Sequence, residues 1–167
     1  VQVRWSFRGG RRDEPLAAIG AGRLLQSVMR HGTSAYGSAE LADALDQFGA
    51  RLSVSLACDS GLVGVSALTA HLPRVMDLVE EVVFRPTLPE AAIDRERSKA
   101  LEVHRHERQQ PEAIAGDWLA WRLYGTHPYG RPASTEYGLM HTDRDVLQAL
   151  HARIFTRATA CCWWWAM

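Results

Sequence analysis

The sequence has few cysteines, no net charge and no long apolar run, and each shortage excludes a class of protein. Nineteen basic and nineteen acidic residues cancel, so no overall field attracts nucleic acid or an anionic membrane. No apolar run approaches the roughly 18 residues that a transmembrane helix needs. The three cysteines are Cys58, Cys161 and Cys162, and they form no disulfide framework and no CxxC metal pattern. We therefore expect no nucleic-acid partner and no membrane span.

Two other features that carry chemistry elsewhere are incomplete here. Gly9-Gly10 is not followed by GxGxxG or GxxxxGK[ST], so it does not predict a phosphate-binding loop. Cys58 has no accompanying His/Asp signature, and we interpret it as a small buried or edge residue rather than a nucleophile. Neither feature predicts a site.

The residues that are present indicate one globular domain. A chain of 167 residues with 47% hydrophobic and 23% charged residues can bury roughly 70% of its unfolded surface. Residues 1–8 alternate apolar and polar side chains, as a half-buried strand does. Leu52, Val54 and Leu56 alternate in the same way, and so do 63–67. The intervening "CDSG" predicts a hairpin turn.

Helical patterns fill most of the remaining sequence. We expect helices over 16–30, 38–50, 72–84, 89–110, 111–124 and 143–155. Ser38 and Thr142 are predicted N-caps. Val103 is expected to face the core, and Trp118 and Trp121 are interpreted as packing residues. Strands and helices are partly segregated, which predicts an α+β fold with an antiparallel or mixed sheet covered by helices.

The order of several motifs resembles a known family. The motifs are "GGRRDEP", "GT" after the first helix, "SAELADALDQFGARLSVSLACDSGLVGVSAL", "LYGTHPYGRPASTE" and "TDRDVLQALHARIF". In this order they resemble the pitrilysin/insulinase metallopeptidases, the inverted zincins, which include the mitochondrial processing peptidase. The resemblance implies the metallohydrolase fold of that family. It also implies that 1–155 is a single, incomplete pitrilysin-like domain, truncated at both ends.

Active members of that family carry H-x-x-E-H on the first helix. Two histidines at i and i+4 bind one zinc ion, and the glutamate activates water. Aligned on "GT", the resemblance places Arg23 and Ser27 at the two histidine positions and Gln26 at the base position. It places Val103 at the position of the third ligand, a glutamate on a later helix. An alignment error of one residue would put Glu102 or His104 there instead.

These replacements cannot perform the chemistry. The guanidinium of Arg23 has no lone pair for a metal, and the amide of Gln26 cannot act as a base near neutral pH. Ser27 is a poor zinc ligand, and Val103 is none. Loss of three ligands and the base removes both the metal and the activated water. We therefore expect no catalytic residue, no metal ligand and no cofactor in this chain, and we interpret Arg23 and Gln26 as water-facing.

The resemblance also implies a role without catalysis. Family members enclose a chamber with homologous domains, and the half that lacks the zinc motif helps to hold the peptide. The chain is therefore expected to pair with a homologous catalytic domain or subunit that carries zinc, and to help bind peptide substrates. Two alternatives stay open. One is a structural core subunit, and the other is an independent hydrolase whose metal site is rebuilt from His104, His106, His127 and His141.

Residues 156–167 form an aberrant tail that ends in Cys161-Cys162-Trp163-Trp164-Trp165. Regrouping the possible codons by one base gives an apolar run that closes with Gly-Asp, as in the strand that follows the last helix of this family. We therefore predict a frameshift near Thr156 or Arg157, which the coding DNA would test. On this hypothesis the tail should pair poorly with the sheet or not at all. The compartment, the substrate and the place of this domain in its parent protein are left open by the sequence.

Overall fold

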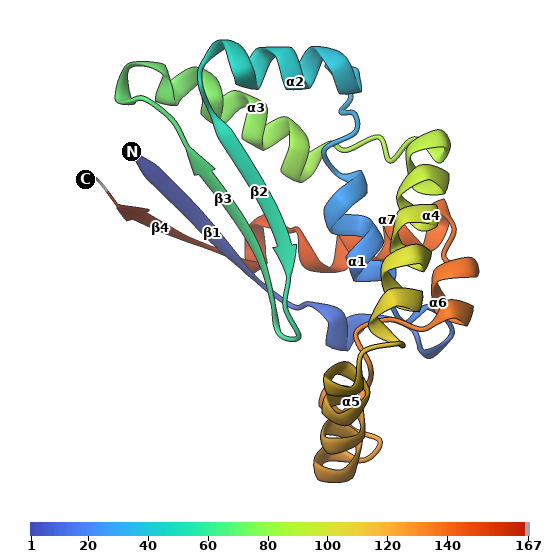
Figure 1. Ribbon diagram of the computed structural model, residues 1–167. Helices are drawn as coiled ribbons and strands as arrows, with labels where there is room; N and C mark the ends of the chain where they lie inside the picture. The colour runs from blue at the N-terminus through green and yellow to red at the C-terminus, as the bar shows by residue number, and fades with distance from the viewer. Residues whose placement is uncertain (166–167) are drawn as a thin grey trace.

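The computed structural model describes the backbone of residues 1–165 and the side chains of residues 1–161 (Figure 1). The strands are β1 (Gln2–Arg8), β2 (Arg51–Leu56), β3 (Ser60–Ser66) and β4 (Ala160–Trp165). The helices are α1 (Ala21–Val28), α2 (Ser38–Gln47), α3 (Leu72–Phe84), α4 (Glu90–Glu107), α5 (Pro111–Tyr124), α6 (Glu136–Met140) and α7 (Arg144–Ile154). The short 3-10 helices are η1 (Arg11–Asp13), η2 (Leu16–Ala18), η3 (Thr69–His71), η4 (Pro128–Gly130) and η5 (Arg157–Thr159).

The four strands form one sheet in the order β2-β3-β1-β4, and every neighbouring pair is antiparallel. Helices cover one face of this sheet (Figure 1). Val3, Phe7 and Val63 point into that face and are buried, whereas Arg4 and Leu62 on the opposite face are exposed. The ring of Phe7 contacts Phe84 of α3 and Phe155 after α7 edge-on. The predicted α+β fold with a helix-covered sheet is therefore confirmed.

The sheet also corrects the expectation for the tail. β4 pairs with β1 over six residue pairs, from Gln2↔Trp165 to Phe7↔Ala160. The expected loss or weakening of this strand is therefore wrong. Strand pairing uses backbone groups, and tryptophan favours strands, so a replaced side-chain sequence does not prevent the ladder. The frameshift itself stays a prediction, as does the division of the chain at residue 155.

The helix predicted over 16–30 divides into two pieces, because Gly20 adopts the left-handed conformation with φ 112°. Its regular α-helical part, α1, begins only at Ala21. The buried carboxylate of Glu14 accepts hydrogen bonds from the backbone N–H groups of Gly20 at 3.0 Å and Gly22 at 2.8 Å. A buried side chain therefore satisfies the N-terminus of α1, where backbone donors lack helical partners.

The two predicted N-caps each lie one residue away from the observed cap. Gly37 precedes α2, and its N–H donates to the carboxylate of Glu40 at 2.8 Å. Asp143 caps α7 by accepting from Val146 N–H at 2.9 Å. The hydroxyl of Thr142 instead donates to the carbonyl of Gly138 at 2.7 Å, which ties α7 to α6, a helix that the periodicity did not predict.

Two expectations about packing are wrong. The side chain of Val103 on α4 is 46% exposed, so it does not face the core. Trp118 and Trp121 on α5 are 63% and 53% exposed. The remaining core is continuous and lies between the sheet and helices α1, α3 and α7. Among the described residues, none of the helices combines the length and the hydropathy that crossing a bilayer requires.

Candidate remnant of a metal site

The positions that the sequence analysis aligned with a zinc motif lie on α1, beside the C-terminal half of α4 (Figure 1). Leu24, Leu25 and Val28 of α1 are buried and fix its orientation against the core. The opposite side of the helix therefore presents Arg23, Gln26 and Ser27, all of them half-buried. The structure brings these three side chains to one side of the helix, as the i, i+3, i+4 spacing predicts.

Arg23 forms a two-pronged ion pair with Glu107 on α4. Its Nη2 lies 2.6 Å from one carboxylate oxygen of Glu107, and its Nη1 lies 3.0 Å from the other. Nη1 also donates to the hydroxyl of Ser134 at 3.4 Å, and His104 lies 3.2 Å from the same hydroxyl. The guanidinium lowers the pKa of Glu107 below its usual range and the carboxylate raises the pKa of Arg23, mainly through their hydrogen bonds.

Gln26 and Ser27 also have partners within the chain. The side-chain oxygen of Gln26 accepts a hydrogen bond from the backbone N–H of Leu56 at 2.9 Å, which links α1 to the end of β2. The hydroxyl of Ser27 donates to the carbonyl of Arg23 at 3.3 Å, one turn earlier in the same helix. The interpretation that Arg23 and Gln26 merely face water is therefore wrong, since both are bonded to other elements.

This donor set does not fit zinc. Arg23 offers only donors, and the carboxylate of Glu107 is committed to it. A zinc site needs three or four convergent lone pairs from neutral imidazoles, thiolates or carboxylates. The side chains described contain no group of three or more His, Cys, Asp or Glu residues that could hold a metal ion. Val103, the aligned third position, carries no lone pair.

The four histidines of the proposed rebuilt site contact separate partners. His104 lies against Ser134, and His106 lies 3.2 Å from the amide of Gln110. Nδ1 of His127 accepts from Tyr129 N–H, and Nδ1 of His141 lies 2.8 Å from the carbonyl of Tyr137. Each imidazole therefore has a local partner on its own element or in a neighbouring loop.

Glu107, the partner of Arg23, is a residue that the sequence analysis did not single out. It lies four residues after Val103 and three after His104, so it shares their side of α4. That spacing is the signal that could have identified it. A cavity of 260 Å³ adjoins the pair and is lined by His104, Glu107, Gly116 and Ser134, among others.

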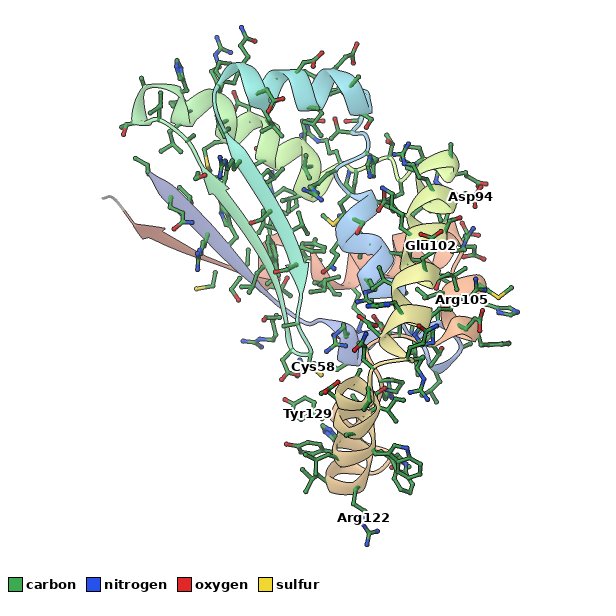
Figure 2. All side chains as sticks on the ribbon, viewed as in Figure 1. Cys58, Asp94, Glu102, Arg105, Arg122 and Tyr129 are labelled. Carbon is green, nitrogen blue, oxygen red and sulfur yellow. The ribbon has the colours of Figure 1, made fainter. Side chains whose placement is uncertain are left out.

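The segment "HPYGRP", which is part of the motif "LYGTHPYGRPASTE", contacts the β2–β3 turn and the segment before α1. His127 is the N-cap of η4, and the hydroxyl of Tyr129, which Figure 2 labels, bonds to the carboxylate of Asp59 in the β2–β3 turn. The guanidinium of Arg131 donates to the carbonyl of Glu14 at 3.3 Å. A Cβ atom on Gly130 would lie 2.5 Å from the carbonyl oxygen of Gly125, so only glycine fits there. The motif therefore fixes the base of α5 against the hairpin and the segment before α1.

Cys58 lies at the same turn and is half-buried. Burial and the neighbouring carboxylate of Asp59 raise the pKa of its thiol. A thiol whose pKa is raised is a poorer nucleophile near neutral pH, because the thiolate is the reactive form. The environment therefore agrees with its interpretation as a small buried or edge residue rather than a nucleophile.

Replacing Arg23 with methionine is expected to lower the free energy of unfolding by about 1 kcal/mol, after allowance for solvent screening of a half-exposed pair. A double-mutant cycle with Glu107→Gln, followed by urea denaturation, measures the coupling. Arg105 and Glu136 form a more exposed pair at 2.7 Å, so Arg105→Met is the matched control and should have a smaller effect. Equal effects of the two arginine variants would contradict a special role for Arg23.

The coupling should also depend on pH. The pKa of Glu107 is lowered in the folded chain, so its contribution is present above its ordinary value of 4.5 and is lost as the pH falls through the folded value. Coupling that shows no loss at any acidic pH at which the chain stays folded would contradict the ion pair.

Comparison with known proteins shows that this chain is similar to peptidases. The family described as Insulinase (Peptidase family M16) matches residues 1–136. An uncharacterized zinc protease of Mycobacterium leprae is 29% identical over 148 residues, which is 88% of this chain and 33% of that protein. The beta subunit of the mitochondrial-processing peptidase of Neurospora crassa is 25% identical over 122 residues, which is 73% of this chain and 26% of that protein. The chain thus matches between a quarter and a third of the length of these relatives.

Solved structures agree on the fold. A peptidase M16 inactive domain from Pseudomonas fluorescens superposes with a TM-score of 0.89 at 24% identity, over 96% of this chain and 40% of that chain. A protease from Helicobacter pylori superposes with a TM-score of 0.87 at 18% identity, over the same shares of the two chains.

Proposed function

The chain belongs to the insulinase family of peptidases, M16, and from this premise we propose that it is a non-catalytic domain of an M16 zinc peptidase assembly. One observation carries the proposal: Arg23, which the motif alignment puts at the position of the first zinc-binding histidine, is ion-paired with Glu107. A permanent cation at that position repels a metal ion and occupies the nearest carboxylate. The domain would help to enclose and bind peptide, while a homologous catalytic domain or subunit supplies zinc.

The base position supports the same proposal. The general base of such a site must be free to take a proton from a metal-bound water. Gln26 has no basic group, and its side-chain oxygen is bonded to Leu56 N–H. The group that would act on water therefore serves instead as a link between α1 and β2. Hydrolysis would have to take place in the partner.

The test uses this chain and an M16 polypeptide that is encoded in the same genome and retains H-x-x-E-H. The isolated chain is expected to contain far less than one zinc per molecule and to hydrolyse no peptide. Adding it to the catalytic polypeptide should form a complex and lower the KM for peptide. Stoichiometric zinc on the isolated chain would overturn the proposal, and a complex with unchanged peptide kinetics would favour a structural subunit.

A second experiment tests whether α1 would bind zinc if the residues of the zinc motif were put back. The triple variant Arg23→His, Gln26→Glu and Ser27→His restores two imidazoles at i and i+4 and frees Glu107. It is expected to bind zinc more tightly than the natural chain, as measured by competition with a chromogenic chelator. The single variant Ser27→His keeps the cation of Arg23 and is the control. Equal zinc affinity of the triple variant and the natural chain would contradict the assignment of α1.

A further inference from the structure

Among the α-helices that the structure describes, α5 differs from the others in contributing no buried residue to the core. Figure 1 shows it extending away from the sheet and from the other labelled helices, and none of its residues is buried. Five of its large apolar side chains are half to two-thirds exposed: Trp118 63%, Leu119 60%, Trp121 53%, Leu123 66% and Tyr124 50%. Such a cluster on one short helix exceeds the scattered apolar exposure of ordinary surfaces.

The apolar residues of α5 surround the helix. Trp118 and Trp121 lie on one side, with their rings in an edge-on contact at 5.5 Å. Leu119 and Leu123, one turn apart, lie on another side. Only three of the fourteen residues are charged. A helix that is apolar all round is normally buried in a larger structure, not exposed to water on most of its circumference.

Contacts outside the core connect α5, and the segment that follows it, to neighbouring elements. Tyr129 in η4, which follows α5, is bonded to Asp59, and Arg108 directly after α4 lies 3.5 Å from the carboxylate of Asp117. Gly130 packs against the carbonyl oxygen of Gly125, where no larger residue fits. These contacts connect α5 and η4 to α4 and to the β2–β3 turn, and a helix placed before binding loses less entropy when it docks.

We propose that α5 is the docking element for a second M16-type domain, carried by the catalytic partner; this inference rests on the proposed function. The matching region is 33% of the Mycobacterium leprae protein and 40% of the Pseudomonas fluorescens chain, so in both most of the polypeptide lies outside it. The cavity beside Arg23–Glu107 is also lined by Gly116 and Asp117 of α5. A domain seated on α5 therefore lies next to the remnant site, as the wall of a shared chamber requires.

The shape of α5 favours such a partner over a second copy of this chain. A symmetric contact between two α5 helices would cover one side of each and leave either the tryptophans or the leucines in water. A partner with a groove covers both sides. The five large side chains offer on the order of 500 Å² of apolar surface, which suits the centre of an interface that buries about 800 Å² on each partner.

The experiment measures binding of this chain to the purified M16 polypeptide of the same genome that retains H-x-x-E-H. Trp118→Gln and Leu123→Gln, which alter opposite sides of α5, should each weaken the Kd about ten-fold or more. Leu68→Gln is the matched control, because Leu68 is as exposed as Leu123, at 66%, and lies outside α5. Its Kd should stay within about two-fold of the natural value. All three variants should keep the natural Tm, since none of the replaced side chains is buried.

The possible outcomes separate the two proposals. If the natural chain does not bind the catalytic polypeptide, the proposed function fails together with this inference. If it binds and the two α5 variants bind equally well, only the docking role of α5 is overturned. If the chain alone forms dimers in sedimentation velocity and Trp118→Gln abolishes them, the occupant is a second copy, and the proposal is overturned in favour of a homodimer.

Discussion

Replacing Glu14 with alanine is expected to lower the free energy of unfolding by about 3 kcal/mol, because it leaves buried backbone donors without partners. Glu14 is only 6% exposed, and its carboxylate accepts from both Gly20 N–H and Gly22 N–H. Alanine would leave these two donors at the start of α1 without acceptors. Urea denaturation of the two proteins measures the difference.

The size of this stability difference should depend on pH, because Glu14 is a titratable group. Burial raises the pKa of Glu14, while the two backbone hydrogen bonds and the charges of Arg11 and Arg131 lower it in part. Since the folded pKa is raised, the contribution of the carboxyl group is fully present below its unfolded value and declines as the pH rises through the folded value. Part of the deficit of Glu14→Ala should therefore shrink as the pH rises.

Glu14→Gln and Glu102→Ala complete the comparison. Glutamine keeps one acceptor but places an amide N–H against a backbone donor. The free energy of unfolding of Glu14→Gln should therefore lie between those of the natural chain and Glu14→Ala. Glu102 is exposed on α4 and should be replaced at little cost in stability. Equal stability of Glu14→Ala and Glu102→Ala would mean that water reaches the first turn of α1 and replaces the carboxylate.

Glu14 also shows where sequence reasoning ends. It stands in the charged stretch "RRDEP", and nothing in that stretch distinguishes a buried carboxylate from its exposed neighbours. By contrast, the alternation of Val3, Trp5 and Phe7 predicted β1, and proline together with the apolar period predicted α3 with its observed bounds. Local periodicity therefore predicts individual strands and helices well. Long-range hydrogen bonds, such as that between Gln26 and Leu56, leave no periodic trace.

The exposed tryptophans illustrate a second limit. The sequence analysis interpreted Trp118 and Trp121 as packing residues, because apolar side chains at helical spacing are usually covered. The structure leaves both in contact with water. Whether an apolar helix packs on its own core or on another protein depends on tertiary geometry. Likewise, the motif alignment located Arg23, Gln26 and Ser27, but their bonding partners became evident only from the fold.

Replacing Gly138 with alanine is expected to lower the free energy of unfolding by about 3 kcal/mol, through a clash with rigid backbone. A Cβ atom at this position in α6 would lie 2.3 Å from the carbonyl oxygen of Ile19 and 2.6 Å from its nitrogen. Ile19 immediately precedes Gly20, the N-cap residue of α1. Relief of the clash would move α6 away and break the hydrogen bond from Thr135 N–H to the Ile19 carbonyl.

Gly116→Ala is the matched control, because Gly116 is also helical but a Cβ atom there would meet nothing within 4 Å. That substitution should be neutral or stabilise the chain by about 0.5–1 kcal/mol, through the better helix propensity of alanine. Opposite signs for the two substitutions in urea denaturation would establish that contact, not propensity, decides the cost at Gly138. If Gly138→Ala instead retains full stability, α6 can shift without disturbing Ile19, and the start of α1 must then depend on Glu14 alone.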